Sequence, residues 1–441
     1  MNENKPKPNG KRGTQRGIAA IAISGYKSIC EKQRIELRPL TLLAGANSSG
    51  KSSAIQPLLL LKQTLEETLD SGALKLGGPN IRFSSATQLL SRTAAKKCAE
   101  VFSIEIEGIK RWKLRIAFKP KKKMGFEISQ MAYEDQEENF VLHEGMTHND
   151  IVSFLHKDLV SLSDHFSKRT GKKVQWGVIR DRCFLWLYLK GAEEIYPRIM
   201  SPAGQVEMSI RGLIHLPGLR GNPERTYPRT AFGPYFPGEF QGYTASIIRQ
   251  WKLTEDVRLK MLGQWLQKLG LTWKVESADI DDIQVELEVG RLTHAAKSGA
   301  MDLVNIADVG VGVSQVLPVA VALLVAEPTQ IVYLEQPEIH LHPKAQVAMA
   351  ELLADAAKRG VIVIAETHSW AILQGIQALA AERKLKPDLI KLHWFVRGDD
   401  GFTKITSRDL DESGAFGDWP EDFGQVSLDV QSRILDAGLF K

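Results

Sequence analysis

The spacing of apolar residues changes along the chain and predicts two kinds of sheet. From Ala99 to about Met131, apolar and polar residues alternate one by one, a pattern typical of antiparallel strands joined by tight turns. In the last third, short apolar runs alternate with stretches of helical length, which predicts parallel strands connected by helices. The elements expected there are a helix over Ser314–Ala326, a strand over Ile331–Leu334, a helix over Lys344–Ala357, a strand over Val361–Ala365, a helix over Ser369–Glu382 and a hairpin from His393 to Ile405.

The amino-terminal part repeats the order of strand and helix. Ile18–Ser24 and Thr41–Ala44 are predicted strands, and the second runs through a glycine-rich loop into a helix expected over Gly50–Leu69. In the middle of the chain, residues 138–170 are expected to be partly helical and residues 173–190 to form a strand pair. The stretch Leu216–Gly242 is rich in proline and glycine, and so long a stretch without regular structure usually binds or covers something.

These patterns predict an α/β fold. We expect a head with an antiparallel β lobe, an inserted α/β segment and no long coiled coil, because no apolar heptad pattern is sustained. The expected segments are a disordered basic tail over residues 1–16, a first lobe over 17–135, an insert over 136–290 and a second lobe over 291–441.

The composition is that of a soluble globular protein. Of the 441 residues, 43% are apolar and 25% are charged, which excludes a disordered or collagen-like chain and leaves room for roughly two to four domains. The net charge of +5 permits a nucleic-acid partner without requiring one. The cysteines form no CxxC pair, the amino terminus has no apolar core, and no apolar run approaches the roughly 20 residues of a membrane span. We therefore expect a cytoplasmic protein that does not contact a membrane.

The strongest chemical signal is Gly45–Ser52, which fits the pattern G-x-x-x-x-G-K-[ST] at every fixed position. Glycines at both ends let backbone N–H groups turn inward around a phosphate, and the following helix adds the positive end of its dipole. Lys51 is expected to reach the β- and γ-phosphates of ATP, and the Ser52 hydroxyl to bind Mg²⁺. The predicted nucleotide contacts of this loop are Gly45, Asn47, Ser48, Ser49, Gly50, Lys51, Ser52 and Ser53.

Two later strand ends supply further groups that a phosphate loop needs. Glu335 follows the apolar run Ile331–Leu334, so its carboxylate is expected at the carboxyl edge of the sheet, where nucleotides bind. A plain surface glutamate at a strand end is the alternative. His368 ends the next predicted strand and is expected at the same edge, in a position to sense the γ-phosphate.

Together these residues resemble a known group of ATPases. Gly45–Ser52, Glu335–Pro343 and Glu366–Ser369 are similar to the heads of prokaryotic ABC-type ATPases that carry AAA names and are related to RecF, SMC and OLD proteins. Trp419–Phe423 resembles the short tail of one subgroup, so the resemblance covers residues 17–100 and 290–441. It implies an ATPase that uses ATP and Mg²⁺. Members of the group resemble ATPase subunits of anti-phage systems such as PARIS and Septu, which implies a separate effector protein as a partner.

The resemblance also implies assembly with a second copy. ABC heads act as head-to-tail dimers, in which each nucleotide lies between the phosphate loop of one copy and the signature motif of the other. The segment similar to that motif is Val309–Gln315, where Gly312, Ser314 and Gln315 are the expected contacts. A homodimer or higher homo-oligomer follows, with a plain glycine-rich helix start as the alternative.

The chain departs from the ABC pattern after the acidic strand. ABC heads place an aspartate for the metal and a glutamate for water at this point, whereas this chain has Glu335 and Gln336. A glutamine can orient water but cannot accept its proton. The expected catalytic residues are therefore Glu335, Glu338 and His368, and the expected metal ligands are Ser52, Glu335 and Gln88.

The expected function is ATP binding and hydrolysis, with slow hydrolysis as an alternative because of Gln336, in the sensor or scaffold subunit of an anti-phage defence complex. Two alternatives stay open. One is a RecF-like repair ATPase, in which Arg220, Arg225 and Arg229 or the basic tail contact DNA. The other is a scaffold that is locked by nucleotide and barely hydrolyses it.

Overall fold

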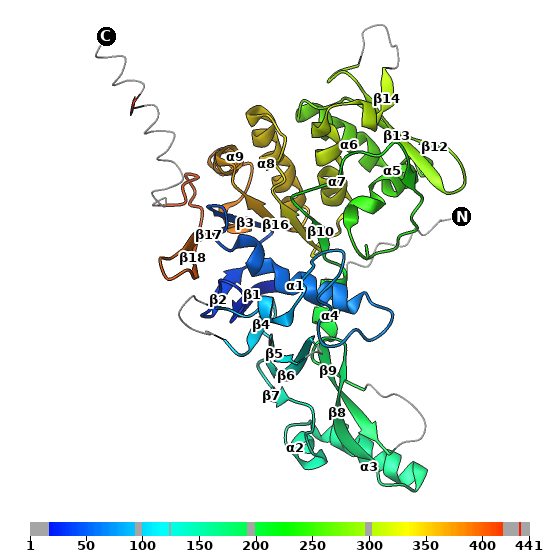
Figure 1. Ribbon diagram of the computed structural model, residues 1–441, viewed down its shortest axis with the longest axis vertical. Coiled ribbons are helices and arrows are strands. Elements are labelled where there is room, and N and C mark those ends of the chain that lie inside the picture. The colour runs from blue at the N-terminus through cyan, green and yellow to red at the C-terminus, as the bar shows by residue number, and fades with distance from the viewer. Residues whose placement is uncertain are drawn as a thin grey trace, which may run out of the picture.

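A mostly parallel sheet of six strands forms the centre of the protein, seen in a computed structural model that describes residues 17–92, 99–122, 125–191, 199–295, 302–417 and 432–433 (Figure 1). The predicted basic tail and the segment Trp419–Phe423 lie outside these residues. The strands, in their spatial order, are β10 (Ile214–Leu216), β15 (Ile331–Glu335), β16 (Ile362–Thr367), β3 (Leu40–Gly45), β17 (Ile390–Arg397) and β18 (Thr403–Arg408). All neighbours pair in parallel except β17 and β18, which form a hairpin.

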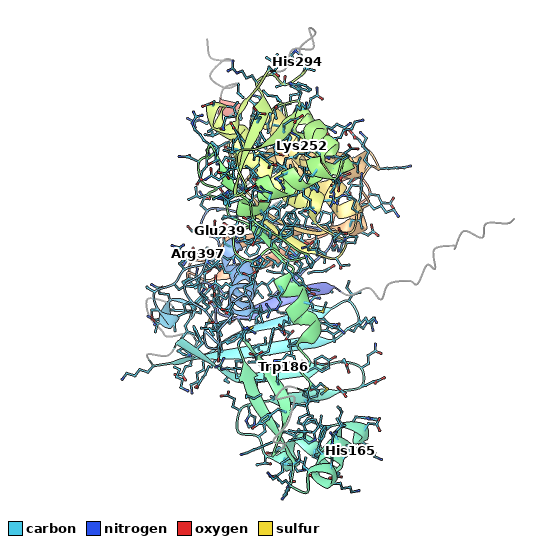
Figure 2. All side chains as sticks on the ribbon, turned by 90° about the vertical axis from the view of Figure 1, so that its right-hand side faces the viewer. His165, Trp186, Glu239, Lys252, His294 and Arg397 are labelled. Atoms are coloured by element: carbon cyan, nitrogen blue, oxygen red, sulfur yellow. The ribbon has the colours of Figure 1, made fainter. Side chains whose placement is uncertain are left out.

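A second, antiparallel sheet lies on one side of the central sheet, together with helix α1 (Lys51–Leu65). Its strands are β2 (Gln33–Glu36), β1 (Ile18–Ser24), β4 (Phe102–Gly108), β5 (Lys113–Lys121), β6 (Gly125–Glu134) and β7 (Asn139–Leu142). Beyond it an arm extends along the long axis and carries His165 near its end (Figures 1 and 2). The arm contains α2 (His148–Val152), α3 (Lys157–Thr170) and the hairpin β8 (Gln175–Asp181) and β9 (Phe184–Lys190).

Helices from the second half of the chain cover the other side of the central sheet. They are α5 (Thr244–Leu253), α6 (Val257–Lys268), α7 (Val311–Val325), α8 (Pro343–Lys358) and α9 (Trp370–Ala381). A small sheet of β11 (Tyr227–Pro228), β13 (Gln284–Gly290), β12 (Val275–Asp279) and β14 (Leu303–Asn305) packs beside α5 at the far end of this half (Figure 1). Helix α4 (Gly204–Arg211) lies against α1.

The central sheet separates two hydrophobic cores, because alternate side chains of a strand point to opposite faces. Leu42 and Val332 belong to the core under helices α5 to α9. Their neighbours Leu43 and Tyr333 belong to the core shared by α1 and the antiparallel sheet. Both faces of the parallel strands are therefore buried, and only the strand ends are left to form a site.

The predicted fold class is confirmed. The head has a parallel sheet, an antiparallel β lobe and an inserted α/β segment, and the longest described helix, α8, has only 16 residues, so the described part of the chain holds no long coiled coil. The short strand β10 and helix α5 were not predicted, and both flank the long proline- and glycine-rich stretch. The other elements that were not predicted are β2, β7, α4, β11 and β14.

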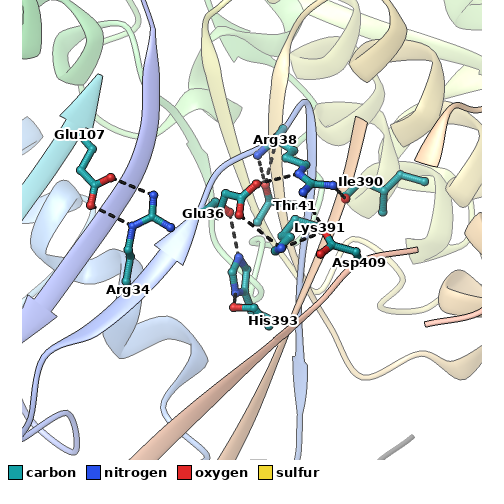
Figure 3. Close-up of polar contacts among 10 residues, drawn as sticks. Arg34, Glu36, Arg38, Thr41, Glu107, Ile390, Lys391, His393 and Asp409 are labelled. Carbon is teal, nitrogen blue, oxygen red and sulfur yellow. Dashed lines mark hydrogen bonds and ion pairs between the residues drawn. The ribbon is translucent and has the colours of Figure 1, made fainter. Parts of the chain in front are cut away.

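His393 is a buried imidazole in the middle of β17 (Figure 3). Its Nε2 lies 2.8 Å from the Glu36 carbonyl oxygen, which can only accept, and its Nδ1 lies 2.8 Å from the Ser407 hydroxyl. Burial lowers the pKa of His393 to about 4, and the charges of Lys391 and Arg34 act in the same sense, whereas Glu36 opposes them. The neutral form therefore belongs to the folded state.

This histidine predicts an acid-sensitive stability. Because the pKa is depressed on folding, the unfolded chain binds the proton more readily, so stability falls as the pH drops from 6.5 towards 4. Between pH 7 and pH 5 we expect the wild type to lose about 2 kcal/mol more than His393→Gln, at 1.36 kcal/mol per pKa unit. Denaturant unfolding of both proteins at several pH values measures this difference. Parallel stability curves for the two proteins would contradict the assignment.

Candidate functional site

The predicted phosphate loop connects β3 to α1 at the carboxyl edge of the central sheet. Gly45 and Gly50 have φ angles of 144° and 105°, in the region that favours glycine. A side chain at Gly45 would clash with the Phe395 carbonyl, and one at Gly50 would clash with the Thr403 hydroxyl. The loop therefore requires glycine at both fixed positions, because of backbone conformation and close packing.

The hairpin β17–β18 holds this loop from one side. The Thr403 hydroxyl donates to the Ser49 carbonyl at 2.7 Å, and Arg397 Nη1 donates to the Ser48 carbonyl at 3.2 Å. Arg397 lies at the middle of the long axis (Figure 2). These contacts explain how a loop so rich in small residues keeps one conformation.

Lys51 is the first residue of α1, and its side chain turns back over the loop. Its Nζ donates to the carbonyls of Gly45 at 3.0 Å and Ala46 at 2.8 Å. Burial lowers the pKa of Lys51, while the nearby carboxylates of Glu366 and Glu338 raise it. The ammonium group thus lies at the bottom of the loop, where a phosphate would meet it.

Ser52 contacts an acidic residue that differs from the predicted one. Its hydroxyl donates to Glu366 Oε2 at 2.9 Å, and the Tyr333 hydroxyl donates to the other oxygen, Oε1. Glu366 is 3% exposed, and burial raises its pKa to about 7; the charge of Glu335 adds to this, and hydrogen bonds from Tyr333 and Ser52 oppose it. The carboxylate that contacts Ser52 is therefore that of Glu366 and not that of Glu335.

Glu335 lies at the same level on the adjacent strand, since parallel pairing aligns it with Glu366. Its carboxylate is held by His215 Nε2 at 3.2 Å and by the Gly218 N–H at 3.2 Å. Burial alone would raise the pKa of Glu335, but these hydrogen bonds and the charge of His215 bring it below its usual value. His215 also stacks on the Tyr333 ring at 5.2 Å, so the two acidic strand ends share one polar network.

Glu338 and His368 meet behind the phosphate loop. One oxygen of Glu338 accepts from the Thr367 hydroxyl at 2.9 Å and from the His368 N–H at 2.8 Å. The other oxygen is buried without a hydrogen-bond partner, and burial raises the pKa of Glu338. Burial and the charge of Lys51 lower the pKa of His368, which favours a neutral imidazole. Glu338 thus fixes the backbone at His368.

A cavity of about 710 Å³ opens over the phosphate loop. The predicted residues that line it are Asn47, Ser48, Gly50, Lys51, Ser52, Ser53, Gln88 and His368. Gln336 and Glu366 line it as well, and Lys27, Arg92 and Arg397 add positive charge, which suits a triphosphate. Gly45 and Ser49 form the loop beneath it, whereas Glu335, Glu338 and the segment Val309–Gln315 do not line it.

The segment similar to a signature motif forms the start of α7, away from this cavity. Gly310 caps the helix, Gly312 and Ser314 are half-buried, and the exposed fraction of Val311 is 47%. Gln315 is instead buried, and its amide donates to the carbonyls of Arg220 and Gly221. The start of α7 therefore keeps some surface for another molecule, chiefly at Val311, whereas Gln315 holds the loop at Arg220 and Gly221.

Arg220 connects the start of α7 to the acidic strand β15. Its guanidinium donates to the carbonyls of Gln315 at 3.2 Å and Glu335 at 2.9 Å, and burial lowers its pKa to about 10. Arg225 pairs with Asp308, and Arg229 donates to the Asp281 carbonyl. The three arginines therefore have separate structural contacts and do not form one basic patch.

Mg²⁺ fits the oxygen ligands at the loop. In the described part of the chain, no group of three His, Cys, Asp or Glu side chains could hold a metal ion. Mg²⁺ commonly takes one or two protein oxygens and completes its shell with phosphates and water. Ser52 and Glu366 supply such a pair, with Gln88 on the wall of the same cavity. When bound, the ion would neutralise phosphate charge.

Sequence reasoning missed Glu366, Tyr333 and His215. The signal for Glu366 was present, because it ends the strand after the one that carries Glu335, and parallel strands place such ends side by side. At this strand end we predicted a role for His368 only. His215 lies on the unpredicted strand β10, so no sequence pattern pointed to it.

The fold and the site define a P-loop nucleotide-binding protein, with a glycine-bounded loop between a buried parallel strand and a helix. The chain belongs to the family described as "AAA domain, putative AbiEii toxin, Type IV TA system", which matches residues 40–374. The family places it among the ATPases of the AAA and ABC type.

Solved structures with a distant similarity are heads of SMC proteins. One is an SMC head bound to the C-terminal winged-helix domain of ScpA (13% identity, 90% of this chain, 99% of that chain, TM-score 0.47). Another is the head from Thermotoga maritima (12% identity, 88% and 98%, TM-score 0.39), and a third, from Pyrococcus furiosus, is bound to the C-terminal domain of ScpA (12% identity, 95% and 99%, TM-score 0.45). No curated protein matches the sequence. The family assignment rests on the domain match.

Proposed function

We propose that this protein binds ATP with Mg²⁺ in the cavity over the phosphate loop and hydrolyses it. The observation that carries the proposal is the convergence of Lys51, Ser52, Glu366 and His368 on this one cavity at the carboxyl edge of a parallel sheet. Lys51 and the loop amides bind the β- and γ-phosphates, and the neutral His368 contacts the γ-phosphate. Phosphate release in the presence and absence of Mg²⁺ tests the proposal, and no release above background under either condition would count against it.

Within this proposal the acidic residues have different roles. Glu366 and Ser52 hold the metal, because their side chains already meet at the cavity. Gln336 lines the cavity and orients water. Glu335 stays a candidate catalytic residue because it is aligned with Glu366. Glu338 supports His368, because its carboxylate accepts a hydrogen bond from the His368 N–H. This arrangement is consistent with slow hydrolysis.

We further propose that a second copy completes the site. The start of α7 carries the exposed Val311 and the half-buried Gly312 and Ser314, and it does not line its own chain's cavity. A helix start presents unpaired N–H groups that suit a γ-phosphate. Ser314→Arg is expected to lower turnover by at least about tenfold, the rate equivalent of 1.4 kcal/mol. It should leave ATP affinity unchanged, because the phosphate loop is not altered.

Turnover and ATP affinity of Ser314→Arg are measured side by side, with Ser161→Arg on the distant arm as the matched control. Equal turnover in both variants would contradict a role for the start of α7.

The cellular role that we propose is the sensor or scaffold subunit of a defence complex with a separate effector protein. The family description, which names a toxin of a type IV toxin–antitoxin system, supports a role in such two-component systems. The described helices include none long and apolar enough to cross a bilayer, and a cytoplasmic location is part of the proposal. We propose that lobes 17–135 and 291–441 carry the site, and that the insert 136–290 reaches it through Gly218 and Arg220.

Direct DNA binding is not favoured, because Arg220, Arg225 and Arg229 are engaged within the chain. Measuring phosphate release with and without duplex DNA distinguishes the RecF-like alternative from the proposed function, since only a RecF-like enzyme should respond to DNA.

A further inference from the structure

A second cavity, of about 460 Å³, lies beside helix α4, which packs against α1. None of its lining residues lines the cavity over the phosphate loop. Trp112, Phe236 and Trp251 line it and are each less than a tenth exposed. Phe232 adds a partly buried ring, which lies 5.8 Å from that of Phe236. The volume falls within the range of about 300–1,000 Å³ that is usual for small-molecule sites.

The edge of this cavity is polar and carries no free positive charge among its described lining residues. The exposed carboxamides of Gln205 and Gln250 lie at the rim, and Glu327 supplies a carboxylate. Arg258 pairs with Asp256 and lies 5.3 Å from the Trp251 ring centre, so its charge is already compensated. Aromatic walls suit a flat ring, carboxamides suit the edge of a purine, and the acidic rim disfavours a phosphate.

We propose that the aromatic cavity is a second ligand site, which takes a planar, uncharged heteroaromatic ring of the nucleobase or nucleoside class. Trp112, Phe236 and Trp251 supply the contact surface, and Gln205 and Gln250 supply hydrogen bonds to the ring edge. The site is distinct from the triphosphate site in residues, charge and shape.

Two hydrogen bonds connect this cavity to the phosphate-loop helix. Lys62 on α1 is fully buried, and its Nζ donates to the carbonyl of Phe236 at 3.1 Å. Lys62 also pairs with Glu66, whose second oxygen accepts from the Gly238 N–H at 3.0 Å. Because α1 begins at Lys51, a ligand that moves the segment around Phe236 changes the support of the helix that carries the phosphate-binding lysine.

The binding test uses the wild-type protein saturated with Mg²⁺ and a non-hydrolysable ATP analogue, which occupies the triphosphate site and blocks it as an alternative position for the base. Adenosine, guanosine, cytidine and uridine are titrated into this protein by calorimetry. We expect one-to-one binding of at least one nucleoside, and a loss of at least tenfold in affinity when Ser209→Trp is added to fill the cavity. Ser161→Trp on the arm is the control and should change nothing.

Binding that survives Ser209→Trp, or no binding of any nucleoside at millimolar concentration, would overturn the proposed ligand site. This outcome does not depend on whether the chain hydrolyses ATP. Failure of the proposed function is therefore distinguishable from failure of this inference.

The coupling between the two sites rests on the proposed ATPase activity. In the wild type we expect the bound nucleoside to change turnover by at least threefold. Glu66→Gln weakens the connection to Lys62, so it should reduce that change while nucleoside affinity stays the same. An equal response of Glu66→Gln and the wild type would exclude this path.

Discussion

Replacing Lys51 by alanine is expected to lower ATP affinity by at least about 100-fold and to abolish turnover. The ammonium group is the only predicted loop side chain that brings a full positive charge to the β- and γ-phosphates, and a charged hydrogen bond contributes up to about 3 kcal/mol. Equilibrium binding of a fluorescent ATP analogue measures the affinity, and circular dichroism shows whether the variant folds.

A matched control for this variant is Lys344→Ala, which removes an exposed lysine from the first turn of α8, outside the cavity. It should bind ATP as the wild type does. If Lys51→Ala also keeps wild-type affinity, the phosphate loop does not bind nucleotide in the way described.

Glu366→Gln is expected to lower turnover by about 100-fold or more. A reduction of about 100-fold is the lower limit of the usual effect when an enzyme loses a side chain that acts at the reacting centre. The carboxylate accepts from Ser52 and lines the cavity, so its loss should also remove the dependence of ATP affinity on Mg²⁺. Steady-state turnover and ATP titrations with and without Mg²⁺ measure both effects.

Glu335→Gln is the informative comparison, because the two carboxylates lie at one level on adjacent strands. The carboxylate of Glu335 is engaged by His215 and Gly218, so we expect this variant to keep the Mg²⁺ dependence of ATP affinity. The opposite pattern, with Mg²⁺ dependence lost only in Glu335→Gln, would show that Glu335 is the metal ligand, as the sequence predicted.

The phosphate loop could be predicted in detail because its chemistry is local. Gly45, Gly50 and Lys51 occupy fixed spacings, and the conformations that require glycine follow from a loop that must curl within a few residues. The order of strands and helices in the last third was equally readable, since buried parallel strands are short apolar runs between helices. His368 lies at the predicted edge because it directly follows one of these strands, β16.

The choice between Glu335 and Glu366 as the partner of Ser52 could not be predicted in the same way, because it depends on register between distant strands. Glu335 and Glu366 are aligned only once β15 and β16 pair, and Ser52 reaches Glu366 because β16 lies between β15 and β3. Gln315 shows the same limit. The resemblance of its segment to a signature motif implied a nucleotide contact, but Arg220, which comes from the long irregular stretch, holds it inside the protein.

The most direct test of the central claim mixes two variants, each of which lacks a different half of the shared site. Lys51→Ala keeps an intact start of α7, and Ser314→Arg keeps an intact phosphate loop. We predict that each protein alone has almost no phosphate release and that the mixture regains a clear fraction of wild-type turnover, because a mixed pair contains one complete site. A mixture as inactive as its components, although mixed pairs form, would contradict a nucleotide held between two copies of this chain.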